Sequence, residues 1–217
     1  MTFDLPNTLQ YVPVLLHALW VSIYVTLASF FAGSILGVFV YLAKSSAARP
    51  ARVLASAYIE VVRNTPLLVQ LYIIYFGLSQ FGFNFNPLWS ALIGMTLNNS
   101  AYTAEIFRGG VEAVPRGLRE AGSALGMRFD QTFRYIVLKP AIRNVLPALT
   151  NQFIVLFLFS SVGSVISLNE LTSKMQDLNS ETLRTFEIFT YGAIMYYLTS
   201  VLIALASRFA ERVLFRW

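Results

Sequence analysis

One stretch near the N-terminus limits the possible folds more than any other part of the sequence. Residues 15–42 read LLHALWVSIYVTLASFFAGSILGVFVYL and contain no Asp, Glu, Lys or Arg. A helix of about 20 apolar residues is long enough to cross the roughly 30 Å of hydrocarbon in a bilayer. The run therefore predicts a membrane-spanning helix rather than a core helix of a soluble domain.

Four further apolar segments follow it. Only 12% of the chain is charged and 56% is hydrophobic, a balance that is typical of membrane proteins. We therefore predict an all-α, polytopic membrane protein with five transmembrane helices, in which residues 1–14 form an extracytoplasmic segment without the basic start of a cleavable signal. The predicted spans are 15–42, 53–80, 88–108, 145–168 and 188–208.

Basic residues indicate the direction of insertion. They lie in the segments between spans one and two and between spans three and four, and again after span five. The segment at 81–87 has none, and Lys174 and Arg184 are the basic residues of 169–187. Cytoplasmic loops carry the excess of Lys and Arg, so the N-terminus is expected outside and the C-terminus in the cytoplasm of a bacterial inner membrane.

Several classes of function are disfavoured by what the sequence lacks. There is no cysteine, and His17 is the single histidine, so neither a disulfide nor a Cys/His metal site is expected. No GxxxxGK[ST] run is present to cradle nucleotide phosphates, and no nucleophile–base pair stands out. A net charge of +5 is compatible with nucleic-acid binding, but the basic residues flank apolar runs, so no nucleic-acid partner is expected.

The cytoplasmic segment between spans three and four differs in character from the rest. It contains PRGLREAGSALGMRFD at residues 115–130, which predicts a helix over 116–128. Ala121, Ala124 and Leu125 share one face of this helix, and Gly122 and Gly126 leave a stripe where another backbone can approach. Two interpretations stay open on pattern alone: a helix that docks into a groove on a partner, and an amphipathic helix lying on lipid headgroups.

Charged residues inside the spans come in pairs with helical spacing. Glu60 and Arg63 are three residues apart in span two, and Glu105 and Arg108 repeat this spacing in span three. Each pair can form an ion pair within its helix, with a structural or a gating role. Pro66 interrupts span two and frees a backbone carbonyl near Val62.

Further polar residues in the spans are candidates for a translocation pathway. Asn64 and Thr65 precede the break at Pro66, and NNSAYT places Asn98, Asn99 and Ser100 deep in span three. These groups either line the pathway or form hydrogen bonds between helices. Gly33 and Gly37 form a GxxxG pattern in span one, which favours close helix packing. The pathway or gate candidates are Glu60, Arg63, Asn64, Thr65, Pro66, Asn98, Asn99, Ser100 and Glu105.

Several co-linear stretches resemble one family. EAGSALG (120–126) followed nine residues later by IVLKP (136–140) is similar to the EAA loop of permease subunits of ATP-binding-cassette (ABC) importers. The stretches at 58–78, 98–117 and 164–172 resemble the branch of that family that carries polar amino acids. The resemblance implies a type I importer transmembrane domain over 15–214, in which the EAA helix couples to a cytoplasmic ATPase. The coupling residues are then Arg119, Glu120, Ala121, Gly122, Ala124, Leu125 and Gly126.

The resemblance also implies partners. Two ABC ATPase subunits would bind ATP and Mg, so no cofactor is expected in this chain, and an extracytoplasmic amino-acid-binding protein would deliver the substrate. Five spans enclose no pathway alone, so a second permease subunit is expected. FLFSSV (157–162) lacks the Lys-Asp pair often found there in the family, which favours a non-identical sister subunit. The alternative is an ion-coupled secondary amino acid transporter, but the inverted repeat typical of that class is not visible.

Overall fold

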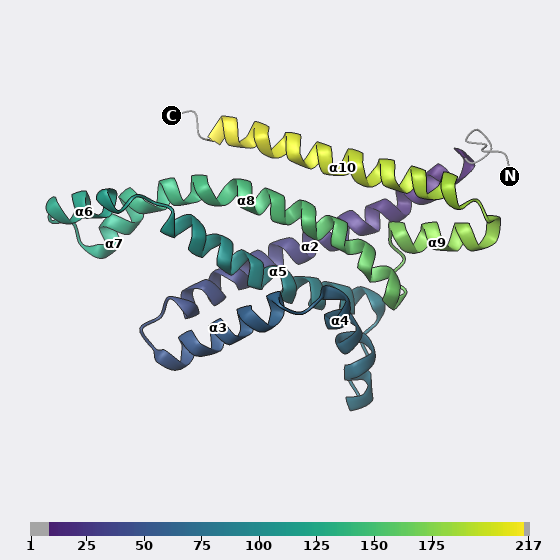
Figure 1. Cartoon of the computed structure of the whole chain (residues 1–217), viewed down its shortest axis with the longest axis horizontal. Helices are drawn as coiled ribbons and strands as arrows, with labels where there is room; N and C mark the ends of the chain where they lie inside the picture. The colour runs from purple at the N-terminus through teal and green to yellow at the C-terminus, as the bar shows by residue number, and fades with distance from the viewer. Residues whose placement is uncertain (1–8, 215–217) are drawn as a thin grey trace.

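The structure, a computed structural model, describes residues 9–214 and is built from helices throughout that range (Figure 1). Long helices run side by side along the molecule, with short helices at their ends. The elements are η1 (Leu9–Tyr11), α2 (Val12–Lys44), α3 (Arg49–Arg63), α4 (Leu67–Tyr72), η2 (Ile73–Gly77), η3 (Leu78–Phe81), α5 (Pro87–Glu112), α6 (Arg116–Ala124), α7 (Phe129–Thr132), η4 (Phe133–Val137), α8 (Leu138–Phe159), η5 (Ser160–Ile166), α9 (Leu171–Thr182) and α10 (Thr185–Leu214).

Three continuous helical stretches of the described chain are long and apolar enough to cross a membrane. They are Leu9–Lys44, Phe129–Ile166 and Thr185–Val213, with mean hydropathies of 2.0, 1.8 and 1.7. Their outer faces carry large apolar side chains such as Phe31 on α2, which is 64% exposed, and Phe209 on α10, which is 71% exposed. Such faces are stable against acyl chains and costly in water.

The predicted second span, 53–80, is not a straight crossing. α3 and the stretch Leu67–Phe81 meet at a bend of 104°. Pro66 lies at the bend with an extended backbone (ψ 140°), and it has no amide hydrogen to donate to the carbonyl of Val62. Counting this bent pair as one span gives four candidate spans in the described chain, so the count of five is not reached by length and composition alone.

α5 covers the predicted third span but is less apolar than the others. It packs against α2, α3, α4 and α8, so its surroundings are mainly other helices of the same chain. Asn98, Asn99 and Ser100 are buried there, together with Thr103. A helix that meets protein on most sides can carry polar groups that would be costly against lipid, which explains its low hydropathy.

Glycines bring α2 and α5 close together. A Cβ on Gly33 would lie 2.8 Å from Nδ2 of Asn99 and 2.9 Å from the carbonyl oxygen of Thr96. A Cβ on Gly37 would lie 2.8 Å from Cβ of Thr103. The packing interpretation of the GxxxG pattern is therefore confirmed.

Two helix boundaries differ from those expected. The predicted helix at 116–128 ends at Ala124, and a helix that was not predicted, α9, occupies most of 169–187, between predicted spans four and five. Glu170 starts α9, because its carboxylate accepts hydrogen bonds from the amides of Thr172 and Ser173. Of the segment 1–14, residues 1–8 lie outside the described residues, and 9–14 already belong to η1 and α2.

Candidate functional site

The first candidate region is α6, which lies with α7 at one end of the bundle (Figure 1). Glu120, Ala121, Ala124 and Leu125 are exposed, and Leu125 is 78% exposed. An apolar, small-residue surface beside an exposed carboxylate suits a protein partner. These side chains lie on the outside of the helix, where both a partner protein and a lipid surface can reach them.

Gly126 ends this helix rather than extending its small-residue stripe. It adopts φ 69°, a left-handed conformation that glycine reaches without strain. The amide of Met127 then donates to the carbonyl of Gly122 (3.0 Å), and that of Gly126 to Ser123 (3.0 Å). This is a glycine-terminated helix end, and it explains why α6 is shorter than expected.

Gly122 faces the chain's own interior. A Cβ there would lie 2.8 Å from Cγ2 of Thr132 and 3.0 Å from Cδ1 of Ile136. Arg119 is also engaged within the chain, because its Nη2 donates to the carbonyl of Val111 (2.7 Å). α6 therefore packs on its own chain through Gly122 and Arg119, while Glu120, Ala121 and Leu125 are exposed.

Phe129 is a residue of this region that the sequence interpretation missed. It begins α7 directly after the turn, is 86% exposed, and stacks on Phe133 with ring centroids 6.4 Å apart. An aromatic residue just beyond a helix-ending glycine in a polar segment was the available signal. Phe129 extends the exposed apolar surface that Leu125 begins.

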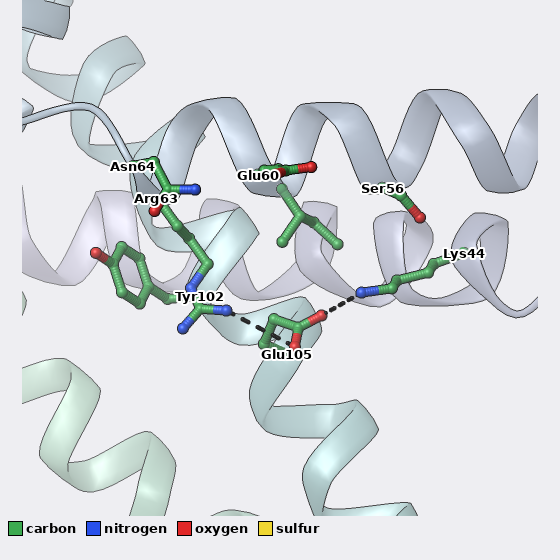
Figure 2. A pocket seen from close by; sticks show the side chains of 8 residues that line it. Lys44, Ser56, Glu60, Arg63, Asn64, Tyr102 and Glu105 are labelled. Atoms are coloured by element: carbon green, nitrogen blue, oxygen red, sulfur yellow. Dashed lines mark hydrogen bonds and ion pairs between the residues drawn. The ribbon is translucent and has the colours of Figure 1, made fainter.

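The second candidate region is a polar cavity between α2, α3 and α5. Its volume is about 350 Å³. Figure 2 shows side chains from all three helices pointing toward it. The lining residues are Lys44, Ser56, Ile59, Glu60, Arg63, Asn64, Tyr102 and Glu105.

Glu105 is the centre of the charges in this cavity. Its carboxylate lies 2.6 Å from Nζ of Lys44 on α2, 3.7 Å from Nη1 of Arg63 on α3 and 2.8 Å from Nη2 of Arg108 on α5 (Figure 2 draws the first two). One carboxylate on α5 thus forms ion pairs with basic side chains of α2, α3 and its own helix. The guanidinium of Arg63 also lies over the ring of Tyr102, 5.2 Å from its centroid.

The expected pairing of Glu60 with Arg63 is wrong, while that of Glu105 with Arg108 is confirmed. Arg63 turns toward Glu105, and Glu60 forms no ion pair with any other residue in the 9–214 range. Arg63 can do so because α3 packs against α5. The cavity therefore contains a carboxylate without a counter-ion beside a cluster with an excess of cations.

The break at Pro66 is held by a side chain that sequence reasoning missed. Nε2 of Gln70 donates to the carbonyl of Val62 (2.9 Å), the group that Pro66 leaves without its helical donor. The same nitrogen lies 2.9 Å from Oγ1 of Thr65, which itself donates to the carbonyl of Val61 (2.9 Å). A glutamine one turn after a helix-breaking proline was the available signal.

From Gln70 a chain of amides continues into the centre of the bundle. Nδ2 of Asn98 donates to Oε1 of Gln70 (3.2 Å). Asn99 donates to the carbonyl of Phe30 (3.2 Å) and accepts from Nε2 of Gln152 on α8 (3.1 Å). Asn99 on α5 is therefore buried and forms hydrogen bonds that join α5 to α2 and α8.

Asn98 and Ser100 have different surroundings. Oδ1 of Asn98 is buried and has no hydrogen-bond partner within the described range. Oγ of Ser100 lies 2.7 Å from the hydroxyl of Tyr58 on α3 and also donates to the carbonyl of Leu97 (2.8 Å). Neither of these two residues lines the cavity at Glu105, although Asn98 keeps one free acceptor beside the break.

The side chains in the described range form no cluster of three or more His, Cys, Asp or Glu residues that could hold a metal ion. A family model described as "Binding-protein-dependent transport system inner membrane component" matches residues 29–216. The chain belongs to this family.

Relatives in this family cover almost the whole chain. Arginine transport system permease protein ArtQ of Bacillus subtilis (strain 168) is 32% identical over 99% of this chain and 98% of the relative. Glutamine transport system permease protein GlnP of Escherichia coli (strain K12) is 33% identical over 98% of each.

Solved structures agree with the sequence relatives. A structure described as an amino acid ABC transporter with histidines matches this member of the binding-protein-dependent family with a TM-score of 0.94 and 38% identity, over 98% of this chain and 99% of that chain. Inward-facing MetNI methionine ABC transporter matches with a TM-score of 0.76 and 20% identity, over 98% and 99%. The second likeness concerns the fold alone.

Proposed function

We propose that this chain is the permease subunit of an ABC importer for polar amino acids. The observation that carries the proposal is the match over nearly the full length to amino acid permeases and to an amino acid ABC transporter at 32–38% identity. These relatives are ABC transport permeases, which does not favour the alternative of an ion-coupled secondary transporter. The chain itself supplies the pathway, and partner ATPase subunits bind ATP and Mg.

The proposed topology has five crossings, with α5 as the third. α5 is 26 residues long, or about 39 Å at 1.5 Å per residue, which is enough to cross a bilayer. The start of α2 and the short α9 lie at one end of the bundle in Figure 1, and α6, α7 and the end of α10 lie toward the other. This arrangement supports an N-terminus outside and a C-terminus in the cytoplasm, where the basic residues gather.

α6 is the proposed coupling helix. Glu120, Ala121, Ala124 and Leu125 would contact the ATPase, with Phe129 at the edge, while Gly122 and Arg119 hold the helix on its own chain. Movement of the ATPases on binding and hydrolysing ATP would then shift α6 and, through α7, η4 and α8, the spans. Coupling of this kind needs contacts that differ between two states.

The pathway is proposed to pass near the bend at Pro66. The free acceptor of Asn98, the amide of Asn64 and the charges of Glu60 and Arg63 lie on α3 and α5 around it. Glu105 would hold the cytoplasmic half of the pathway closed, because a movement of α3 away from α5 breaks the ion pair between Arg63 and Glu105. Because FLFSSV lacks the Lys-Asp pair, a non-identical sister permease is proposed to supply most substrate contacts, after delivery by a binding protein.

The test is amino acid uptake into proteoliposomes that contain the chain with its ATPase, sister permease and binding protein. Glu120→Lys reverses a charge on the exposed face of α6. We expect uptake and amino-acid-stimulated ATPase activity to fall by roughly tenfold, which corresponds to about 1.4 kcal/mol of lost contact free energy.

The matched control is Glu181→Lys, the same charge reversal on exposed Glu181 of α9. It should leave uptake unchanged. Uptake that needs no nucleotide and ignores Glu120→Lys would contradict the proposal and favour an ion-coupled carrier.

A further inference from the structure

A second, basic cavity lies between the start of α8 and the end of α10, which are the cytoplasmic ends of these helices in the proposed topology. Its volume is about 320 Å³, and it is lined by Arg143 and Pro147 from α8 and by Arg208, Glu211 and Arg212 from α10. Three guanidinium groups and one carboxylate thus line the same cavity. Across residues 9–214, no carboxylate lies within ion-pair distance of Arg143, Arg208 or Arg212. The cavity therefore has a net positive charge, because Glu211 is the one carboxylate among its lining residues and forms no ion pair with the three arginines.

Orientation of the protein in the membrane does not account for this arrangement. Basic residues that set topology need only lie in the correct loops, and they gain nothing from converging. Arg49 and Arg52 on α3 illustrate the difference, since neither lines the basic cavity or the cavity at Glu105, and Arg52 donates to the carbonyl of Ser46 (3.4 Å). Arg143, in contrast, is brought beside Arg208 by packing of α8 against α10, although they are far apart in the sequence.

An apolar groove continues from the basic cavity along the α8–α10 seam, which is the line of contact between these two helices. Its volume is about 220 Å³, and it is lined by Phe30, Leu146, Leu149, Thr150, Phe153, Ile203 and Ser207. Leu146 adjoins Pro147, and Ser207 adjoins Arg208, so the two hollows are neighbours on both helices. The basic cavity lies at the helix ends, and the groove runs toward the membrane interior.

Two of the residues that line the groove, Thr150 and Ser207, are polar. The hydroxyls of Thr150 and Ser207 are hydrogen-bonded to each other across the seam, and Ser207 also donates to Oε1 of Glu211 (3.3 Å). Pro147 has no amide hydrogen, so the carbonyl of Arg143 lacks its helical donor and can accept from a ligand hydroxyl. The seam thus changes from charged, through hydroxylated, to apolar along its length.

This order of chemistry matches one ligand class. We infer that the α8–α10 seam binds an anionic phospholipid of the cytoplasmic leaflet, with its phosphate at Arg143, Arg208 and Arg212 and an acyl chain in the groove. Basic pockets between spans on the cytoplasmic side attract anionic headgroups, and each arginine near the surface contributes about 1 kcal/mol. The groove is what distinguishes a phospholipid from free phosphate, because a free anion gains nothing from Leu149 or Ile203.

The test uses the full-length chain, purified in detergent, stripped of lipid and titrated with phosphatidylglycerol or phosphatidylcholine, with bound lipid counted by native mass spectrometry. We expect phosphatidylglycerol to bind at least roughly tenfold more tightly than phosphatidylcholine, and its affinity to fall as salt is raised. The double variant Arg143→Gln/Arg208→Gln should weaken phosphatidylglycerol by about fivefold per arginine. Binding of phosphatidylcholine should not change.

Two further variants separate a specific site from general attraction. Arg49→Gln/Arg52→Gln removes the same charge from the same side of the membrane and should leave the affinity for phosphatidylglycerol unchanged. Ile203→Trp fills the groove and should weaken phosphatidylglycerol while the arginines remain. Circular dichroism confirms that each variant is folded, and the salt dependence of the wild type needs no variant at all.

Four results would overturn the inference. They are equal binding of the two lipids, equal loss in the Arg49/Arg52 control, displacement of lipid by glycerol 3-phosphate at the same concentration, and a protein partner at the seam. The last is checked with Arg143→Cys carrying a photo-crosslinker in the assembled complex, which is site-specific in this chain because it contains no cysteine. Crosslinks to another subunit rather than to lipid would show that protein covers the seam.

Discussion

Single residues show how tightly the helices of this protein are fitted. Gly33 and Gly37 on α2 leave no room for a side chain, because the atoms facing them belong to α5. Gly109 on α5 is different, since a Cβ there would meet nothing within 4 Å. The same residue type therefore has opposite roles at these positions.

Replacing Gly33 by Leu should destabilise the protein. The new side chain collides with Asn99 and the carbonyl of Thr96, and overpacking of this kind costs about 1–3 kcal/mol. The measurement is thermal unfolding in detergent followed by circular dichroism. Gly109→Ala is the matched control and should raise stability by about 0.5–1 kcal/mol, because Ala favours the helix and has space. Equal effects of the two would mean that α2 and α5 do not pack as described.

At the scale of elements, the bend between α3 and α4 is the feature most dependent on side chains. Pro66 removes one backbone donor, and Gln70 replaces it with its own amide. The same side chain accepts from Asn98 (3.2 Å), so the bend is joined to α5. An angle of 104° between two helical segments is thus fixed by hydrogen bonds rather than left flexible.

Gln70→Leu should weaken the bend. It leaves the carbonyl of Val62 with only the longer contact from Thr65 (3.4 Å) and removes the partner of Asn98. Loss of partners for part-buried polar groups costs about 1–3 kcal/mol. Faster hydrogen exchange in 60–72 than in the wild type is the expected readout. Gln80→Leu, at an exposed position of η3, is the control, and an equal change there would contradict the role given to Gln70.

At the scale of the whole molecule, Glu170 joins distant parts of the chain. Its buried carboxylate starts α9 and also accepts from the hydroxyl of Tyr196 on α10 (3.0 Å) and from Ser22 on α2 (3.3 Å). In the sequence, Glu170 lies between the helical stretches Phe129–Ile166 and Thr185–Val213, so it is outside the segments that are long and apolar enough to span a membrane. Burial raises the pKa of the Glu170 carboxyl above its ordinary value of 4.5, although the amides of Thr172 and Ser173 oppose the shift.

This shift predicts a pH dependence of stability. Between about pH 4.5 and the raised pKa, the folded state retains a proton that the unfolded state has lost. The folded state then binds more protons, so the contribution of Glu170 to stability falls as pH rises through this window and levels off above it. Unfolding of the wild type and Glu170→Gln, measured from pH 4.5 upward, should show the fall in the wild type alone.

Asp177→Asn is the control for that measurement. Asp177 belongs to the same helix, but its side chain is 50% exposed and pairs with Lys174. The control should keep the wild-type slope. A Glu170→Gln protein with the same slope as the wild type would show that another group titrates.

Much of the element order could be predicted because it depends on neighbours along the chain. Apolar runs predict helices long enough to span, Pro66 predicts a break, and Gly33 with Gly37 predicts close packing. The bounds of α6 and the existence of α9 were missed, since both depend on local hydrogen bonds, at Gly126 and at Glu170, that hydrophobic patterns do not report.

The sequence by itself determined that this chain is a helical membrane protein, where its polar interruptions fall, and which residues of α6 belong together. Only the tertiary structure decided the partners. Arg63 pairs with Glu105 on α5 instead of with Glu60 on its own helix, and Gly122 packs against Thr132 and Ile136. Arg143, Arg208 and Arg212, which are on two different helices, line one cavity. The physical reason is that helix formation is specified by residues within a turn or two, whereas ion pairs and close packing depend on side chains that meet only when separate helices come together.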